Sequence, residues 1–291
     1  MAGLIIKEKF RGYVALTKPR IMVLLLVTAI TGLFLGEQGV PSVTLLIVVL
    51  LGGAFASGGA SAINHYLDRD IDSKMRRTRN RPIPSKRTSP LEALIFGVVL
   101  NALGFLVFIY WANPLSAILA ITGTLFYVFV YTMFLKRNTP QNIVLGGAAG
   151  AIPPLVGYAA VTGTVSVSAV YLFLIIFFWT PPHFWALALM IKDDYERAGI
   201  PMMPVVKGVE HTKRSIFAYT VFLIGLSLMF TWAQGMGWVY FIISVVLGSI
   251  FVYYAWNLLK LGTERATKRM YLYSLAYLFL LFAGVMLDAT V

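Results

Sequence analysis

The segment VTLLIVVLLGGAFASGGASAI (residues 43–63) carries no charged side chain and is followed at once by NHYLDRDID (residues 64–72). A helix needs about 20 predominantly apolar residues to cross the roughly 30 Å hydrocarbon core of a bilayer. The first segment therefore predicts a transmembrane helix. The second segment places three aspartates directly where that helix leaves the membrane.

Eight further segments are similarly long and apolar, which indicates a membrane protein. Of the 291 residues, 59% are hydrophobic and only 12% are charged, whereas soluble domains average about 25% charged residues. The predicted fold class is all-α, a polytopic membrane bundle of nine transmembrane helices. The other predicted spans are 21–35, 91–111, 115–135, 143–161, 167–191, 216–232, 238–261 and 270–287.

The connections between the spans suggest a single membrane domain over residues 1–291. No linker rich in Pro, Ser or Gly divides the chain. Residues 1–20 form an N-terminal segment before the first span, and two loops, 64–90 and 192–214, are long, polar and rich in charge. These loops follow the second and sixth spans, so they lie on the same side of the membrane. We expect them to form the active site.

The positions of the basic residues predict the orientation. Every Lys and Arg, 24 in all, lies in the N-terminal segment or in the loops after spans two, four, six and eight. Short loops rich in these residues stay on the cytoplasmic side. We therefore expect a cytoplasmic N-terminus, an external C-terminus and a net charge of +12 confined to one membrane face, which does not require nucleic-acid binding. The N-terminal segment does not resemble a transit peptide, which favours the inner membrane of a bacterial cell.

The spacing of the polar residues after the second span predicts a metal site. If the helix continues past residue 63, Asn64, Asp68 and Asp72 recur every four residues and share one face, while Asp70 points away. Carboxylates stacked at a membrane boundary repel each other unless a cation neutralises them. Mg²⁺ suits this position, because it takes one or two carboxylates together with substrate phosphate oxygens. The absence of Cys excludes thiolate metal sites, disulfides and a cysteine nucleophile.

A second acidic cluster, with Asp193, Asp194 and Glu196, follows the sixth span. Two such clusters across a cavity would hold two Mg²⁺ ions around one diphosphate, with Asp193 and Asp194 as ligands. The predicted catalytic residues are Asn64, Asp68, Asp72 and Asp194. Basic side chains near the carboxylates would bind the diphosphate oxygens. The predicted diphosphate-binding residues are Arg76, Arg77, Arg81, Lys192 and Arg197.

Simpler interpretations of the same residues remain open. The positive-inside rule alone accounts for the basic loops, and Asp70, Glu196 and most of the arginines fit solvated ion pairs. His183 lies inside a predicted span, where an ionisable side chain is a functional candidate. Its alternative is a neutral imidazole hydrogen-bonded to a neighbouring helix. His65 and His211 are expected to be structural or surface residues.

Five stretches resemble the UbiA superfamily of intramembrane prenyltransferases, and most closely its heme-modifying branch. The stretches are KPR (18–20), NHYLDRDID (64–72), KMRRTRNRP (74–82), PHFWA (182–186) and DYERAGIPMMPVV (194–206). The spacing of the Asn and Asp residues in the second stretch is common to the superfamily and implies a prenyl diphosphate. The resemblance runs over most of the chain.

The resemblance implies a central cavity open sideways to lipid, with the diphosphate held by Mg²⁺ at its cytoplasmic mouth. Asn64, Asp68 and Asp72 match the first metal motif. Asp194 matches the second, but the superfamily often has another Asp where this chain has Ala198, so Asp193 and Glu196 are the candidates to complete that ligand set. The implied reaction transfers the farnesyl group of farnesyl diphosphate to a vinyl group of heme B, with addition of water, giving heme O.

The same resemblance implies the surroundings of that reaction. The product would serve terminal oxidase assembly and heme A synthesis, so a heme A synthase or an oxidase assembly factor is an expected partner, beside the lipid bilayer. His183 is the expected heme contact. Two alternatives stay open: a prenyltransferase whose acceptor is a quinone-precursor aromatic acid or a chlorin alcohol acceptor, and a secondary transporter. The clustering of acidic residues at one mouth disfavours the transporter.

Overall fold

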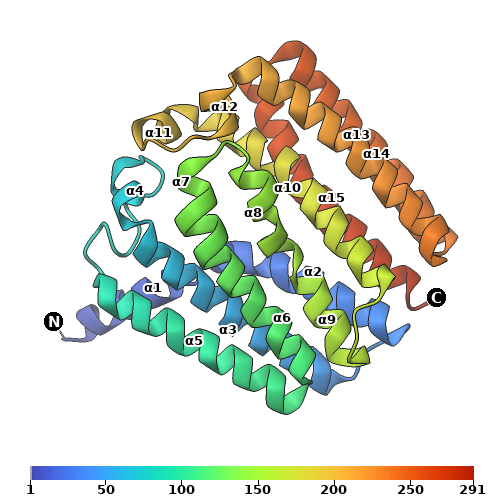
Figure 1. Ribbon diagram of the computed structural model, residues 1–291, viewed down its shortest axis with the longest axis horizontal. Helices are drawn as coiled ribbons and strands as arrows, with labels where there is room; N and C mark the ends of the chain where they lie inside the picture. The colour runs from blue at the N-terminus through green and yellow to red at the C-terminus, as the bar shows by residue number, and fades with distance from the viewer. Residues whose placement is uncertain (1) are drawn as a thin grey trace.

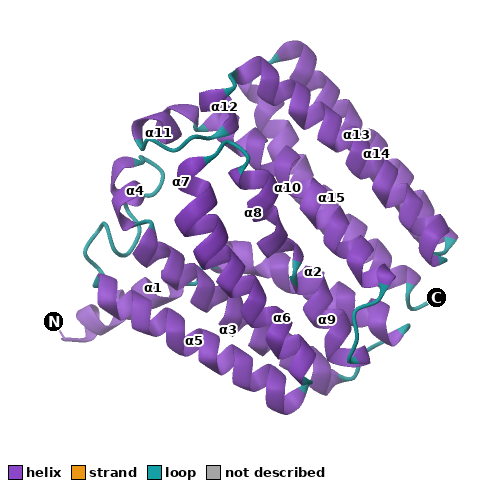
Figure 2. Cartoon of the chain, viewed as in Figure 1, coloured by secondary structure: helices purple, strands orange, loops and turns teal. Residues whose placement is uncertain are grey.

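The computed structural model describes residues 2–291, with side chains from residue 7 onward. Over this range the regular structure is helical, and no strand occurs in it (Figure 2). Nine helical segments within it are long and apolar enough to cross a membrane, which confirms the predicted bundle. The spans are Pro19–Glu37, Val43–Leu67, Pro90–Trp111, Pro114–Asn138, Asn142–Thr162, Val167–Met190, Val209–Gln234, Trp238–Leu261 and Glu264–Asp288.

Seven spans are single helices, namely α2, α3, α5, α10, α13, α14 and α15 in chain order. The fourth span combines α6 (Pro114–Leu125), the π-helix η1 (Phe126–Leu135) and α7 (Lys136–Asn138). The fifth combines α8 (Asn142–Ala151) and α9 (Pro153–Thr162). Outside the spans lie α1 (Ala2–Leu16), α4 (Arg69–Lys74), α11 (Lys192–Arg197) and α12 (Met203–Val206).

Local signals in the sequence set where helices begin and break. Ser89 and Glu92 form a reciprocal capping box at the start of α5, and Pro90 occupies its first turn, where a missing N–H costs nothing. Pro153 has the opposite effect inside the fifth span. Because proline lacks an N–H, it interrupts the hydrogen-bond ladder and divides the span into α8 and α9.

Helices α2 and α9 approach each other closely through glycine. A Cβ added at Gly157 would lie 1.8 Å from the carbonyl oxygen of Ala29, and one at Gly32 would lie 2.0 Å from that of Pro154. Small residues let helix backbones come together in membranes, where packing rather than the hydrophobic effect drives association. This contact joins the first span to the fifth.

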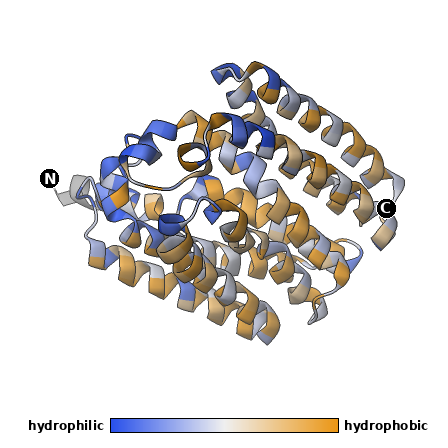
Figure 3. Cartoon of the chain, turned by 45° about the horizontal axis from the view of Figure 1, so that its top comes forward, coloured by the Kyte–Doolittle hydropathy of each residue, from blue (hydrophilic) through white to orange (hydrophobic). Residues whose placement is uncertain are grey.

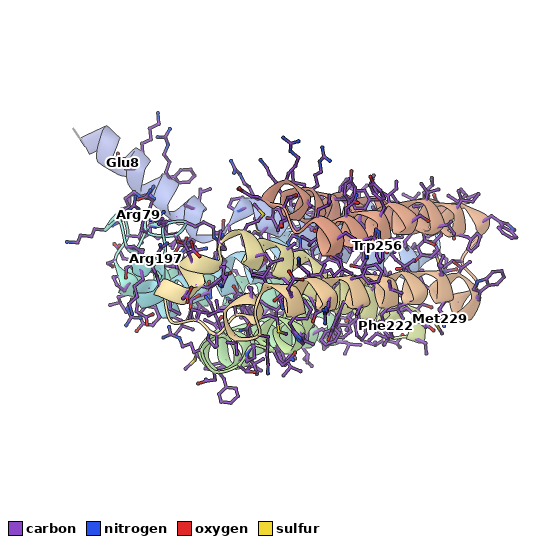
Figure 4. All side chains as sticks on the ribbon, turned by 90° about the horizontal axis from the view of Figure 1, so that it is seen from above. Glu8, Arg79, Arg197, Phe222, Met229 and Trp256 are labelled. Atoms are coloured by element: carbon purple, nitrogen blue, oxygen red, sulfur yellow. The ribbon has the colours of Figure 1, made fainter. Side chains whose placement is uncertain are left out.

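The short helices gather at one end of the bundle. Figure 1 shows α4, α7, α11 and α12 at this end, and Figure 3 shows hydrophilic residues concentrated there. We call the end built from loops 64–90 and 192–214 the polar mouth. The sides of the bundle are apolar: Phe222, Met229 and Trp256 project outward from α13 and α14 (Figure 4) and are 54%, 58% and 45% exposed. Lipid is the solvent that suits such a surface.

The N-terminal segment contains a helix that the sequence did not predict. Helix α1 packs beside the start of α5, where Lys9 Nζ lies 2.7 Å from Glu92 Oε1. The Tyr13 and Phe96 rings meet edge to face, with centroids 4.9 Å apart. The segment is therefore fixed to the third span at the level of the polar mouth.

We predict that Gly157→Ala lowers the melting temperature of the detergent-purified protein by several degrees. Overpacking costs about 1–3 kcal/mol, and each kcal/mol shifts Tm by roughly 2–4 °C in a chain of this size. Gly150→Ala is the matched control, because a Cβ there meets no atom within 4 Å. Equal melting temperatures for the two variants would contradict the close α2–α9 contact.

Candidate functional site

The first acidic segment keeps its helical register through a kink. Helix α3 ends at Leu67, and Asp68 (φ −89°, ψ 6°) joins it to α4. The Asp68 N–H still donates to the Asn64 carbonyl at 2.9 Å, and the Asp72 N–H donates to the Asp68 carbonyl at 2.8 Å. As predicted, Asn64, Asp68 and Asp72 share one buried face, with 3%, 1% and 2% of their surfaces exposed. Asp70 points outward and is exposed.

Each of these three side chains has a basic partner from another part of the chain. Arg81 Nη1 donates to both carboxylate oxygens of Asp72, at 2.8 and 2.9 Å. Lys136 Nζ donates to Asp68 Oδ2 at 2.5 Å, and Lys18 Nζ donates to Asn64 Oδ1 at 2.8 Å. Burial, reinforced by the charge of Arg81, lowers the pKa of Lys18 to about 7. Three basic side chains thus contact the three polar groups.

Lys18 and Lys136 are site residues that the sequence reasoning missed. In the sequence, Lys18 belongs to the stretch KPR before the first span and Lys136 to the short basic loop after the fourth, and neither position points to the acidic residues. The π-helix η1 explains how Lys136 reaches the site. Thr132 lies in this π-helix, and its Oγ1 accepts a hydrogen bond from the Asn64 amide at 3.1 Å. Lys136 follows directly after the last residue of the π-helix. Segments of π-helix occur frequently at functional sites, but no residue pattern in this apolar stretch predicts one.

The second acidic segment meets the first through Asp194. The Arg77 backbone N–H donates to Asp194 Oδ2 at 3.2 Å, and the Arg197 guanidinium pairs with Oδ1. Burial acts to raise the pKa of the Asp194 carboxyl, but the backbone N–H groups of Arg77 and Arg76, together with Arg197, hold it below its ordinary value. The two polar loops therefore come together at the mouth, as the sequence predicted.

Other predicted site residues lie nearer the surface. The side chains of Asp193, Arg76 and Arg77 are exposed, and that of Lys192 is half-buried. Asp70 forms a surface ion pair, which was the simpler of its two interpretations: Arg137 Nη2 lies 2.9 Å from Asp70 Oδ1. The hydrogen bond from this guanidinium holds the pKa of Asp70 below its ordinary value. Their roles in metal and diphosphate binding remain predictions.

The donor set of the mouth fits Mg²⁺. Asp68 Oδ1 is buried and has no hydrogen-bond partner among the described residues. The neighbouring donors, from Asn64 and Asp72, are hard oxygens of the kind that Mg²⁺ prefers. Among side chains from residue 7 onward, no three of His, Asp and Glu are grouped as metal ligands.

The three histidines differ in their environments. His65 is 2% exposed, and its Nδ1 lies 3.9 Å from Asp72 Oδ2. His211 is exposed in the first turn of α13. His183 lies within α10, where its Nδ1 is 2.7 Å from Ser274 Oγ of α15. That contact is the neighbouring-helix hydrogen bond considered as the alternative for His183.

We expect Lys136→Met to destabilise the protein by about 3 kcal/mol, because removing one partner strands a buried charge. Asp68 is 1% exposed in this pair and Lys136 is 15% exposed. The measurement is unfolding by denaturant in detergent. Lys9→Met provides the control: its pair with Glu92 is 50% and 36% exposed, and such surface pairs contribute little to the free energy of unfolding. Equal losses in the two variants would argue against a buried Asp68–Lys136 pair.

Two solved structures share this architecture. One, of a digeranylgeranylglyceryl phosphate synthase, superposes with a TM-score of 0.79 at 19% identity and covers 97% of this chain and 99% of its own. The other is a UbiA homologue from Archaeoglobus fulgidus bound to DMAPP and Mg²⁺. It has a TM-score of 0.66 at 17% identity and covers 94% of this chain and 99% of its own. At these identities the likeness concerns the fold.

Sequence comparison gives the family. A protoheme IX farnesyltransferase of Symbiobacterium thermophilum is 51% identical over 285 residues, covering 96% of this chain and 94% of that protein. One from Trichodesmium erythraeum is 50% identical over 286 residues, covering 98% and 87%. The profile of the UbiA prenyltransferase family matches residues 25–283. The chain belongs to the UbiA prenyltransferase family.

Proposed function

We propose that the protein transfers the farnesyl group of farnesyl diphosphate to a vinyl group of heme B, with addition of water, giving heme O. The observation that carries this proposal is the buried face of Asn64, Asp68 and Asp72 at the polar mouth, in a chain about half identical to protoheme IX farnesyltransferases over nearly its whole length. Membership of a prenyltransferase family removes the transporter alternative.

The mouth supplies the groups that hold a departing diphosphate. Asn64, Asp68 and Asp72 would hold one Mg²⁺, and Asp194 with Asp193 a second. When bound, Mg²⁺ neutralises the charge that develops on the leaving group. Guanidinium and ammonium groups bind the remaining oxygens. We add Lys18 and Lys136 to the predicted diphosphate-binding residues, which are Arg76, Arg77, Arg81, Lys192 and Arg197.

The reaction breaks the farnesyl carbon–oxygen bond, the vinyl π bond and one O–H bond of water, and it forms one carbon–carbon and one carbon–oxygen bond. The farnesyl carbon–oxygen bond breaks with its electron pair on the diphosphate, leaving an allylic cation. The π electrons of the heme vinyl group form the new carbon–carbon bond, and water then adds to the resulting cation and loses a proton. The protein contributes position and electrostatic stabilisation. His183 is the proposed heme contact.

We also propose an orientation with the polar mouth and N-terminus in the cytoplasm of a bacterial cell and the C-terminus outside its inner membrane. The distribution of all 24 Lys and Arg residues supports it. Heme A synthase or terminal oxidase assembly proteins would then meet the enzyme within this membrane. An alkaline phosphatase reporter fused after Val291 should be active and one fused after Lys207 inactive. The reverse pattern would overturn the orientation.

The first test of the reaction is product analysis. Detergent-purified protein is incubated with farnesyl diphosphate, heme B and Mg²⁺, with a chelated sample alongside, and the hemes are resolved by mass spectrometry. The expected product is heavier than heme B by one farnesyl group plus water and forms only with Mg²⁺. Transfer to an aromatic quinone precursor instead of heme B would identify a different acceptor in the same family.

Site variants refine that test. Asp68→Ala and Asp72→Ala should each lower turnover by at least about 100-fold, because each removes a group that stabilises the developing charge. Asp70→Ala is the matched control, since that carboxylate lies in the same segment but faces outward. Its turnover should stay within twofold of wild type. Wild-type turnover in either buried-site variant would disprove the metal assignment.

A further inference from the structure

The His183 ring is held on both faces and along one edge. It stacks on Trp179 of the same helix, with centroids 4.4 Å apart, and on Tyr271 of α15, with centroids 5.0 Å apart. Ser274 lies one turn beyond Tyr271 and contacts His183 Nδ1 at 2.7 Å. The Trp179 indole N–H also donates to the Ser274 carbonyl at 2.8 Å. The ring therefore has a fixed orientation between the sixth and ninth spans.

The hydrogen bonds of Ser274 determine which nitrogen of His183 carries the proton. The Ser274 hydroxyl donates its one hydrogen to the Tyr271 carbonyl, at 2.6 Å. With the hydroxyl in this orientation its oxygen accepts from His183, which places a proton on Nδ1. In the neutral imidazole the lone pair then lies on Nε2.

The lone pair of Nε2 has no partner within the described part of the chain. No hydrogen bond joins Nε2 to another residue there. Both ring nitrogens of His65 are fully buried without a hydrogen-bond partner, but Nε2 of His183 is not one of these fully buried atoms. The His183 ring is half-buried although it lies deep between spans. Nε2 is thus accessible within the membrane part of the bundle.

We propose that His183 Nε2 is the axial ligand of the heme iron when the acceptor substrate is bound, an inference that rests on the proposed function. Imidazole is a common ligand of heme iron, and metal-binding histidines typically donate their other ring N–H to a fixed acceptor, as His183 does to Ser274. The chain offers no cysteine. Of the other two histidines, His65 is sealed and His211 lies on the surface.

Iron ligation by His183 would place the heme and the diphosphate at different depths in the membrane. His183 lies seven residues before the end of α10 at Met190, a rise of about 10 Å. The iron therefore binds deeper in the membrane than the carboxylates of the mouth. A macrocycle held there would lie on the membrane side of the polar mouth.

The test is spectroscopic and does not require turnover. Purified full-length protein is titrated with ferric heme B and followed by optical absorption and electron paramagnetic resonance. Wild type should show nitrogen-ligated iron. His183→Gly should lose this signature and bind heme at least about tenfold more weakly, and added imidazole, which can fill the vacated space, should restore the signature. His211→Gly should match wild type.

Ser274→Ala tests the proton assignment. It should weaken heme binding on the order of tenfold, as loss of a partner that orients a ligand typically does. Ser249→Ala is the matched control, because Ser249 Oγ makes a similar bond to its own helix, to Val245 at 2.7 Å, without touching a histidine. Equal heme affinity in the two variants would contradict the role of Ser274.

Two results would overturn axial ligation: a wild-type spectrum in His183→Gly, or a lost signature that imidazole fails to restore. Product analysis of the wild-type protein is run in parallel. If heme O forms and the heme spectrum is unchanged in His183→Gly, only the ligation inference fails. If the wild type forms no farnesylated heme, the proposed function itself fails.

Discussion

Two carboxylates buried at a membrane boundary are the constraint on which the polar mouth depends. Asp68 and Asp72 are almost fully buried, and an isolated charge in such a place is strongly unfavourable. Each is neutralised by a basic group from a different segment, Lys136 after η1 and Arg81 in the loop. The carboxylates therefore fix the relative positions of the second span, the fourth span and the loop between spans two and three.

The membrane part of the chain obeys a different constraint, the satisfaction of every backbone hydrogen bond without water. Long helices meet it directly, and irregular backbone is tolerated where protein surrounds it. The break at Pro153 is one departure from regular helix, and the π-helix η1, which keeps its hydrogen bonds within its own segment, is another. The first allows α9 to pack closely on α2, and the second delivers Thr132 and Lys136 to the mouth. Departures from regular helix here serve packing and the site.

The sequence predicted the features that local physics decides. Nine apolar runs gave the nine spans, and a four-residue spacing placed Asn64, Asp68 and Asp72 on one face despite the kink at Asp68. It did not predict the partners of these residues. Lys18 lies 46 positions from Asn64, and Lys136 lies 68 positions from Asp68, so only the packing of whole helices brings them together. Both interpretations of His183 stayed open because its partner, Ser274, is 91 positions away.

The polar mouth can stabilise charged groups, whereas the interior of the bundle can stabilise apolar ones. This difference determines which part of each substrate lies at which depth in the membrane. A diphosphate is stable only beside the cationic groups at the mouth. A fifteen-carbon tail gains about 0.8 kcal/mol per buried carbon, which favours the bilayer by roughly 10 kcal/mol. The farnesyl carbon bonded to diphosphate must therefore lie just below the carboxylates, with its tail running deeper. In the proposed reaction a heme anchored at His183 would approach that carbon from the apolar side, so the new bond would form where water is scarce.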